Sequence, residues 1–537
     1  MAEPREPVGP GGPDPSAPSP VEAEAEVGPF ESPMASAGSA DPSERAALTE
    51  PADPGKAKPT ARTAALVSAR MVLGALGVVV AAGTIAAVTL LPLPSVSEQP
   101  PSELVDPVAT AQQLLCPGAF LRLADETGQG ATTSSPVGRA TVERDATTGT
   151  VQATPLAQSD ASGSGGTASA PTVLESPPNE ADPNAAVLVG GAQSQEIQGT
   201  EFAGLAAATC AVASGDSWLV GGSTAVGRTT LLTLSNPTEV TATVDLELFG
   251  ENGKVSAPGT NGIDVPPNGQ RVLSIAGFAP GLKSPVVHVT SRGGRVVANL
   301  QQSIVRGIDP GGIDIVGHST DPSTAVHIPG IVMTDHIGVE QLFSAEGSED
   351  ILTTVRMFVP GDQDATATVN LAPEAGAGTG ASFQVTVPAG SVSDFPIAEL
   401  ENGRYTLTIE TDVPFVAAAR VTSVGDNGTD FAWISSAPRL TGDTLFATPQ
   451  HGMPALQLSN PASADLSVFL SGNGAPDVEV LVPAGSSTTA KLQPGASYLA
   501  SGFDSLFATV VILDAGFIAS YSVHPPGLAS TPIRVYP

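Results

Sequence analysis

The chain has 537 residues, with 22 Lys or Arg against 54 Asp or Glu, so its formal net charge is −32 at pH 7. A protein this acidic is repelled by nucleic acid and by anionic lipid headgroups, which excludes nucleic-acid binding. Aromatic residues make up only 4% of the chain, too few for the aromatic platforms that usually recognise glycans. The length would allow three or four domains of ordinary size.

Residues 1–70 are rich in Pro, Ala, Glu and Ser, and Phe30 is their only aromatic residue. A segment of this composition buries too little apolar surface to offset the entropy lost on ordering. We therefore expect a disordered cytoplasmic tail. A plain solvated tail and a docking or phosphorylation segment both fit this composition.

Residues 71–91 form an unbroken apolar stretch without a charged side chain. As a helix the stretch would be roughly 31 Å long, close to the roughly 30 Å hydrocarbon core of a bilayer. Four basic residues lie between positions 56 and 70, whereas the first basic residue after the stretch is Arg122. The sequence therefore predicts one transmembrane helix in contact with membrane lipid, with a cytoplasmic N-terminus and an extracytoplasmic C-terminal region. The alternative is a cleaved secretory signal, which normally has a shorter apolar core.

The two cysteines, Cys116 and Cys210, both follow the apolar stretch. An oxidising compartment favours a disulfide, and two cysteines allow one pairing. Cys116 lies in an expected membrane-proximal segment, residues 92–124, and residues 125–185 have the composition of a low-complexity linker. The disulfide would tie that segment to the folded region across the linker. Two unpaired buried thiols are the alternative.

From residue 186 onward, apolar and polar residues alternate with a period of two, as at Ala242, Val244, Leu246 and Leu248. This period is typical of half-buried antiparallel strands. Asn252-Gly253, directly after this run, predicts a hairpin turn. No amphipathic helix of any length interrupts the pattern, so we expect a mainly β fold.

Three similar stretches predict three tandem units, residues 186–330, 331–440 and 441–537. In each, a strand ends at a proline, a second strand ends at Val-Pro, and an apolar strand closes the unit. These elements are marked by Pro237, Val265 and Val296, then by Pro360, Val387 and Val416, and finally by Pro461, Val482 and Phe517. Short strands with frequent turns favour antiparallel immunoglobulin-like or fibronectin-like β-sandwiches. A propeller is less favoured because its blades need only about 40–50 residues.

The chain has no Gly-x-Ser-x-Gly, His-Glu-x-x-His, phosphate-loop or Cys-x-x-Cys motif. We therefore predict no catalytic residue, no metal, no cofactor and no enzymatic activity. Two alternatives remain for chemistry. Four histidines, near several aspartates, could form a metal or acid–base cluster, and the acidic turn from Gly425 to Asp430 could hold calcium although it lacks a closing Glu. The four histidines of this possible cluster are His288, His318, His327 and His336. The two tryptophans, Trp218 and Trp433, are expected in the core.

Further motifs carry a resemblance to a known family. They are Leu114-Leu-Cys-Pro-Gly118, Ala208-Thr-Cys-Ala-Val, and Gly307-Ile-Asp-Pro-Gly-Gly-Ile-Asp leading into Ile328-Pro-Gly330. With the apolar stretch, they resemble an actinobacterial membrane-anchored envelope family, domain of unknown function 5719. The resemblance covers roughly Ala65 to the C-terminus. It implies a location in the cell envelope and supplies no activity.

Two function classes follow from the sequence. The first is a non-enzymatic envelope scaffold or binding module that contacts a wall polymer or another envelope protein, and it predicts a groove between β units. The second is a membrane-tethered enzyme or accessory subunit acting on envelope glycans or lipids. Its first candidate residues would be Asp309, Asp314 and His318.

Overall fold

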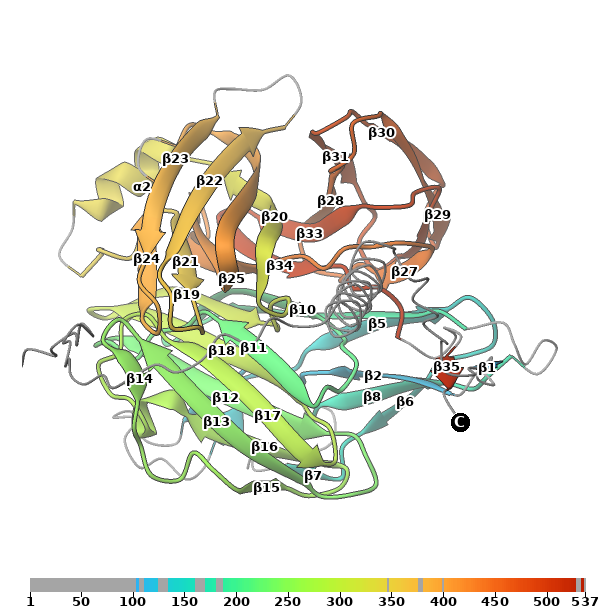
Figure 1. The fold of residues 1–537 in the computed structure, drawn as a ribbon, viewed down its shortest axis with the longest axis horizontal. Coiled ribbons are helices and arrows are strands. Elements are labelled where there is room, and N and C mark those ends of the chain that lie inside the picture. Colours follow the sequence, from blue (N-terminus) through green and yellow to red (C-terminus); the bar gives the residue numbers. More distant parts are fainter. Residues whose placement is uncertain are drawn as a thin grey trace, which may run out of the picture. The chain divides into compact units, whose positions relative to one another are not determined.

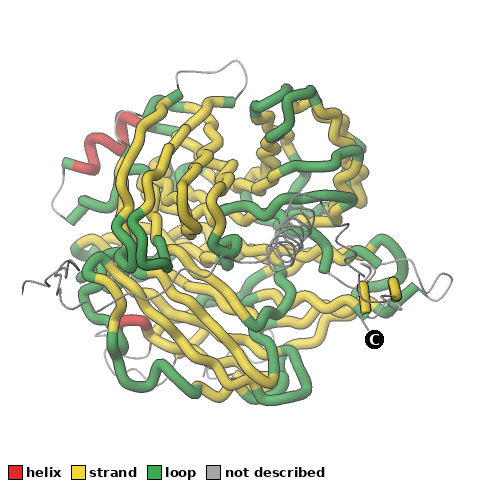
Figure 2. Tube along the Cα trace, viewed as in Figure 1, coloured by secondary structure: helices red, strands yellow, loops and turns green. Residues whose placement is uncertain are grey.

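The computed structural model describes residues 103–105, 111–123, 134–159, 170–179, 187–344, 347–374, 380–397, 400–527 and 533–535. The expected tail, 1–70, and the expected transmembrane helix, 71–91, lie outside these residues. Among the residues described, no helix is both long enough and apolar enough to cross a membrane. The described chain is mainly antiparallel β (Figures 1 and 2), as predicted, and its helices are α2 (His336–Phe343) and the short 3-10 helix η2 (Ile275–Gly277).

The strands fall into four modules within the compact body Gln99–Pro537. The N-terminal module spans residues 112–210 and has two small sheets. The first sheet has the order β2-β8-β6, with β2 (Gln112–Cys116), β8 (Thr172–Ser176) and β6 (Gln152–Pro155). The second sheet has the order β10-β9-β5, with β10 (Ala203–Thr209), β9 (Val189–Gln198) and β5 (Thr141–Ala146). Short pairs are β3 (Leu121–Leu123) with β4 (Ser134–Pro136) and β1 (Glu103–Val105) with β35 (Ile533–Val535).

This module differs from the expected organisation, because its strands β4, β5, β6 and β8 lie within residues 125–185, the expected linker, as does the two-residue strand β7 of the second module. The composition concealed them because polar and small residues such as Thr and Ser dominate these strands. The predicted disulfide is confirmed: Cys116 at the end of β2 is bonded to Cys210 just after β10. A Cβ on Gly191 of β9 would lie 3.0 Å from the Sγ atom of Cys210, so the close packing of the disulfide requires glycine there.

The second module spans residues 216–316 and has two sheets. The first contains β11 (Asp216–Val220), β17 (Val286–Gly293), β13 (Ala242–Gly250), β14 (Gly253–Val255) and β15 (Ile263–Val265). The second contains β19 (Asp309–Val316), β18 (Val297–Arg306), β12 (Arg228–Asn236), β16 (Gly269–Ser274) and the two-residue β7 (Gln158–Ser159). The predicted alternation in β13 is confirmed, since all four of its alternating apolar side chains are buried. The predicted hairpin at Asn252-Gly253 is also confirmed, because Gly250 pairs with Gly253.

The third module spans residues 323–435. Its strands are β20 (Ser323–Met333), β21 (Thr354–Phe358), β22 (Ala365–Pro373), β23 (Ala381–Val387), β24 (Val392–Pro396), β25 (Gly403–Gly425) and β26 (Gly428–Ser435). The long strand β25 pairs with β20 and β22 through its first half and with β21 and β26 through its second half. The expected unit boundary at residues 330 and 331 falls inside β20.

The fourth module spans residues 444–522. One sheet has the order β27-β32-β29-β30, with β27 (Thr444–Ala447), β32 (Ser497–Ser501), β29 (Leu466–Asn473) and β30 (Val478–Val482). The other has the order β31-β28-β33-β34, with β31 (Ser487–Lys491), β28 (Met453–Ser459), β33 (Phe507–Asp514) and β34 (Phe517–Ser522). By pairing, β33 corresponds to β18 of the second module. The strand marked by Phe517, which was expected to close this unit as β18 closes the second module, is therefore not the counterpart of β18 but the strand after that counterpart, β34.

The strands that end at Pro237 and Pro461 share the sequence Leu-x-Leu-Ser-Asn-Pro, and its asparagine has a structural role. The side chain of Asn236 donates to the carbonyl groups of Val240, Val265 and Pro266. Asn460 makes the equivalent three bonds, to Ala464, Val482 and Pro483. Both asparagines are buried, and each fastens its strand to the Val-Pro edge of the same unit.

Four strands, one from each module, contact one another: β10, β19, β26 and β34. Asp430 of β26 is fully buried, and its carboxylate accepts backbone N–H groups from Leu205, Ile313 and Ile518, at 2.8, 3.0 and 3.1 Å. A Cβ on Gly312, which has φ +117°, would lie 2.6 Å from the Oδ1 atom of Asp430. The carboxylate thus bonds to all three other modules.

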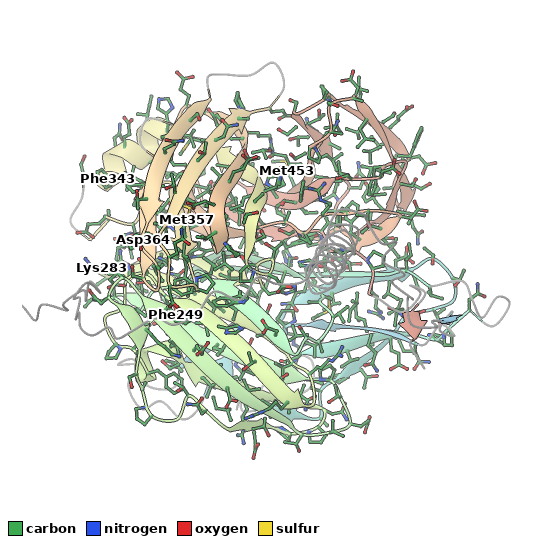
Figure 3. The ribbon with its side chains drawn as sticks, in the orientation of Figure 1. Phe249, Lys283, Phe343, Met357, Asp364 and Met453 are labelled. Atoms are coloured by element: carbon green, nitrogen blue, oxygen red, sulfur yellow. A yellow bond between two sulfur atoms is a disulfide. The ribbon has the colours of Figure 1, made fainter. Side chains whose placement is uncertain are left out.

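The cores of the second and third modules are continuous. Phe249 of β13 packs on Phe358 of β21, with ring centroids 4.4 Å apart, and Trp433 of β26 belongs to the same buried cluster. Figure 3 shows Phe249 beside the third module, to which Met357 belongs. Both tryptophans are buried, as predicted. This shared core fixes the two walls of the site described next.

Candidate anion-binding site

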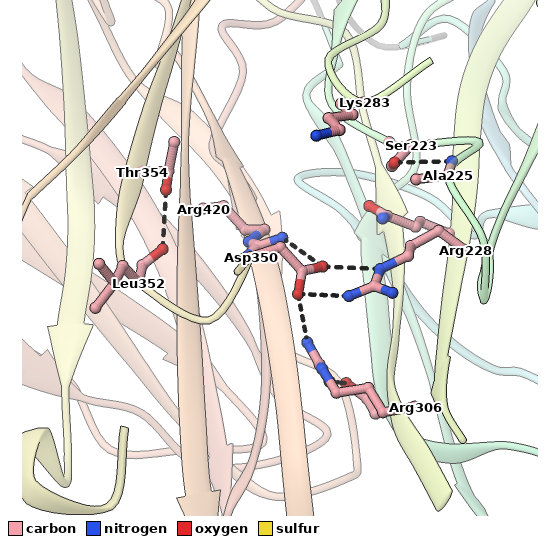
Figure 4. A network of polar contacts seen from close by, with 12 residues as sticks. Ser223, Ala225, Arg228, Lys283, Arg306, Asp350, Leu352, Thr354 and Arg420 are labelled. Carbon is pink, nitrogen blue, oxygen red and sulfur yellow. Dashed lines mark hydrogen bonds and ion pairs between the residues drawn. The ribbon is translucent and has the colours of Figure 1, made fainter. Parts of the chain in front are cut away.

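A cavity of about 790 Å³ lies between the second and third modules. Its lining contains five basic side chains, although the whole chain has only 22 basic residues. These are Arg228, Lys283, Arg306, Arg356 and Arg420, all but Arg356 labelled in Figure 4, and the acidic lining residues are Glu349, Asp350 and Asp394. The lining is therefore basic in a strongly acidic protein, which favours an anionic ligand.

Strand pairing places the arginines. Arg228 begins β12 and Arg306 ends β18, and because these antiparallel neighbours pair with Arg228 opposite Ile304, both arginines reach the same end of the sheet. Arg420 lies on β25 opposite Thr354 of β21. Residues from distant parts of the sequence therefore meet at the junction of the two modules.

Asp350 holds three of the arginines together (Figure 4). Its Oδ1 atom lies 2.8 Å from Nη2 of Arg228 and 3.0 Å from Nη2 of Arg306, and its Oδ2 atom lies 3.2 Å from Nη1 of Arg420. Burial alone would raise the pKa of Asp350, but the three guanidinium groups hold that pKa well below its ordinary value. One carboxylate faces three cations here, so the cluster keeps excess positive charge.

Arg356 forms a rigid wall of the cavity. Its Nε and Nη2 atoms donate to the two carboxylate oxygens of Asp394, at 2.8 and 2.9 Å, and its Nη1 atom donates to the carbonyl of Gly222 at 2.9 Å. The guanidinium also stacks on the ring of Trp433, 4.5 Å from the centroid. All the nitrogen atoms of Arg356 are therefore engaged within the protein.

Arg420 differs from Arg356 in a way that points to a ligand. Only 5% of Arg420 is exposed, yet its Nε and Nη2 atoms have no hydrogen-bond partner among the described residues. These two atoms form the edge of a guanidinium group that binds a carboxylate or phosphate with two parallel hydrogen bonds. Arg356 uses this same edge for Asp394, and Arg228 uses it for Asp350.

Lys283 and Glu349 complete the charged lining. No hydrogen bond or ion pair joins either charged group to another described residue, and Lys283 lies beside the arginine cluster without a dashed contact in Figure 4. The free ammonium adds to the cationic donors of the site that no described residue satisfies, which are Nε and Nη2 of Arg420 and Nε of Arg306. A ligand with anionic oxygens would satisfy both Lys283 and Arg420.

The candidate residues Asp309, Asp314 and His318 do not form one site, because no contact in the described structure joins their side chains. Asp309 is exposed at the start of β19. Asp314 is fully buried and accepts the backbone N–H groups of Trp433 and Ile315, and burial raises its pKa to about 8. His318 packs against His524, with ring centroids 4.6 Å apart.

The four candidate histidines make different contacts, although His318 and His327 line one cavity of about 510 Å³ together with His524 and Asp321. His288 lies between Asp216 and Glu247, 3.1 Å from each, and stacks on Trp218. The rings of His327 and Phe507 stack 3.9 Å apart, and Nδ1 of His336 lies 3.1 Å from the side-chain oxygen of Asn402. Burial lowers the pKa of His327 to about 4. In the described part of the chain, no group of three or more His, Cys, Asp or Glu side chains could hold a metal ion.

The acidic turn at Gly425 joins β25 to β26, and Asp430 directs its carboxylate to the backbone groups described above. Sequence reasoning missed the arginine cluster, because its members come from four separate segments with no shared spacing. The only feature of the sequence that could have pointed to this site is the scarcity of basic residues. In so acidic a chain, an arginine found buried is a candidate for binding an anion once its neighbours are known.

These features define a mainly β protein of four modules with a basic cavity between two of them. The chain belongs to the family of unknown function DUF5719, whose model matches residues 157–495 and thus spans the whole cavity. No curated protein matches the chain. The solved structure of the chicken CNTN1 FN1-FN3 domains is 10% identical and covers 59% of this chain and 97% of that chain, with a TM-score of 0.10. At that TM-score the likeness carries no argument.

Proposed function

We propose that the protein is a non-enzymatic, membrane-anchored scaffold of the cell envelope that binds an anionic group of a wall polymer or partner protein in the cavity between the second and third modules. The single observation that carries this proposal is Arg420, a residue of the cavity lining whose Nε and Nη2 atoms are buried without a partner among the described residues. A buried guanidinium edge left unpaired is costly, and an anionic ligand would remove that cost.

Other features support the proposed location in the cell envelope and the proposed modular architecture. The disulfide between Cys116 and Cys210 suits an oxidising compartment, and the apolar stretch at 71–91 supplies the proposed anchor. The paired antiparallel sheets of the second and fourth modules suit immunoglobulin-like sandwiches. A stack of such modules offers a cavity at a junction rather than a catalytic cleft.

Isothermal titration calorimetry of the purified protein with inorganic phosphate and with glucuronate tests the proposed site. We expect saturable binding of at least one anion, and we expect Arg420→Gln to weaken it by about tenfold or more, because a charge-assisted bidentate contact is worth about 1.5–3 kcal/mol. Arg292→Gln is the matched control, since Arg292 is 74% exposed and paired with Asp245 away from the cavity. Equal affinities of the wild type and Arg420→Gln would exclude the site.

The proposed topology has a separate test in intact cells. Protease added outside should degrade the β region and leave residues 1–70 intact, because only the C-terminal region would be exposed to it. Mass spectrometry of the protected peptides provides the readout. Loss of the tail with retention of the β region would show the opposite orientation.

A further inference from the structure

The mouth of the cavity carries exposed apolar side chains. Val226, which lines the cavity, is 94% exposed, and Ile308, next to the lining residue Gly307, is 89% exposed. Among the large hydrophobic residues that the structure describes, these two are the most exposed. Isolated exposed aliphatic side chains are ordinary, but here one lines the cationic cavity and the other directly follows a lining residue, so the site is amphipathic.

The two turns that bear these residues lie side by side. The backbone N–H of Val305 donates to the carbonyl of Gly227 at 2.8 Å, which joins the turn before β12 to the end of β18. Ala225, Val305 and Pro396 also line the cavity. The apolar rim therefore comes from both modules and adjoins the charged lining.

The charge of the lining favours a dianion. Five basic groups face three acidic ones, so a ligand with about two negative charges would neutralise the cavity, and a phosphate monoester carries about −1.5 to −2 at pH 7. Its oxygens suit the two free donors of Arg420 and the ammonium of Lys283. A single phosphate ion would leave most of a 790 Å³ cavity empty, so the ligand has a further part.

From these observations we infer that the cavity binds a phosphate monoester carried on an apolar chain, with the phosphate on Arg420 and Lys283 and the chain against Val226 and Ile308. This inference rests on the proposed anion site and names its ligand class. The strong acidity of the remaining surface opposes adhesion to an anionic membrane, which favours capture of one such molecule in the cavity.

Calorimetry of the full-length protein with three soluble probes tests the inference. They are hexyl phosphate, hexanoate and inorganic phosphate, all used below concentrations at which they aggregate. We expect hexyl phosphate to bind at least tenfold more tightly than either of the others, because it alone satisfies both the charge and the apolar rim. Val226→Ser combined with Ile308→Ser should abolish the gain from the hexyl chain, so that hexyl phosphate binds no more tightly to this variant than inorganic phosphate does.

Leu481→Ser is the matched control, because Leu481 is 59% exposed on β30 of the fourth module and lies outside the cavity lining. Thermal unfolding of each variant confirms that it is folded. If hexyl phosphate and inorganic phosphate bind equally well, and Arg420→Gln weakens both, the anion site stands and the apolar part of the inference is overturned. If Arg420→Gln changes neither affinity, the proposed site itself fails.

Discussion

Arg356 and Arg420 are both buried arginines of the third module, and they show how the same side chain serves two purposes. Arg356 is saturated by Asp394 and by backbone carbonyls, so it fastens β21 to β24 and to the second module. Arg420 keeps one ion pair, to Asp350, and leaves two nitrogen atoms unpaired. An unpaired buried charge lowers the stability of a protein, and residues that lower stability in this way are often retained because they bind a ligand.

This contrast predicts opposite effects on stability. Arg420→Met should raise the free energy of unfolding by about 1 kcal/mol, because it removes a poorly paired buried charge while Asp350 retains Arg228 and Arg306. Arg356→Met should lower it by about 3 kcal/mol, because Asp394 loses its bidentate partner. Urea unfolding followed by tryptophan fluorescence measures both changes. Equal destabilisation by the two substitutions would mean that Arg420 is purely structural.

At the level of strands, the sequence predicted those features that depend on neighbouring residues. Alternation located β13, and Asn252-Gly253 located its hairpin. The repeated prolines marked corresponding strands in two modules, although the buried asparagine that bonds to the Val-Pro edge in each was not foreseen. The strands of the N-terminal module that precede residue 185 escaped detection because they are short and mostly polar, so alternation gives little signal there. Its strand β5, for example, has no fully buried residue.

The candidate site depends on contacts that no local pattern encodes. Arg228 and Arg420 are separated by nearly 200 residues, and their meeting requires the pairing of β12 with β18 and the packing of the second module on the third. The histidine-rich segment showed the reverse problem. Its four histidines are near in sequence, but their rings contact different partners, and of the four only His318 and His327 line a common cavity.

For the molecule as a whole, the contact of β10, β19, β26 and β34 decides whether four modules behave as one body. Asp430 bonds to backbone N–H groups of the three other modules, so one side chain couples all four. Burial raises the pKa of Asp430, and the N–H donors oppose that shift. The cavity between the second and third modules depends on this coupling, because its two walls belong to different modules.

Asp430→Asn tests the coupling with a nearly isosteric change. An amide nitrogen at either oxygen position would face at least one N–H donor, leaving that donor unpaired, so the free energy of unfolding should fall by about 1–3 kcal/mol. The matched control is Asp426→Asn, in the exposed turn before β26, which should stay within about 0.5 kcal/mol of the wild type. Urea unfolding of the three proteins provides the comparison, with phosphate titration as a second readout. Unfolding of Asp430→Asn at the wild-type midpoint would show that the modules hold together without this carboxylate, whereas a lower midpoint with weaker phosphate binding would tie the cavity to the junction of the four strands.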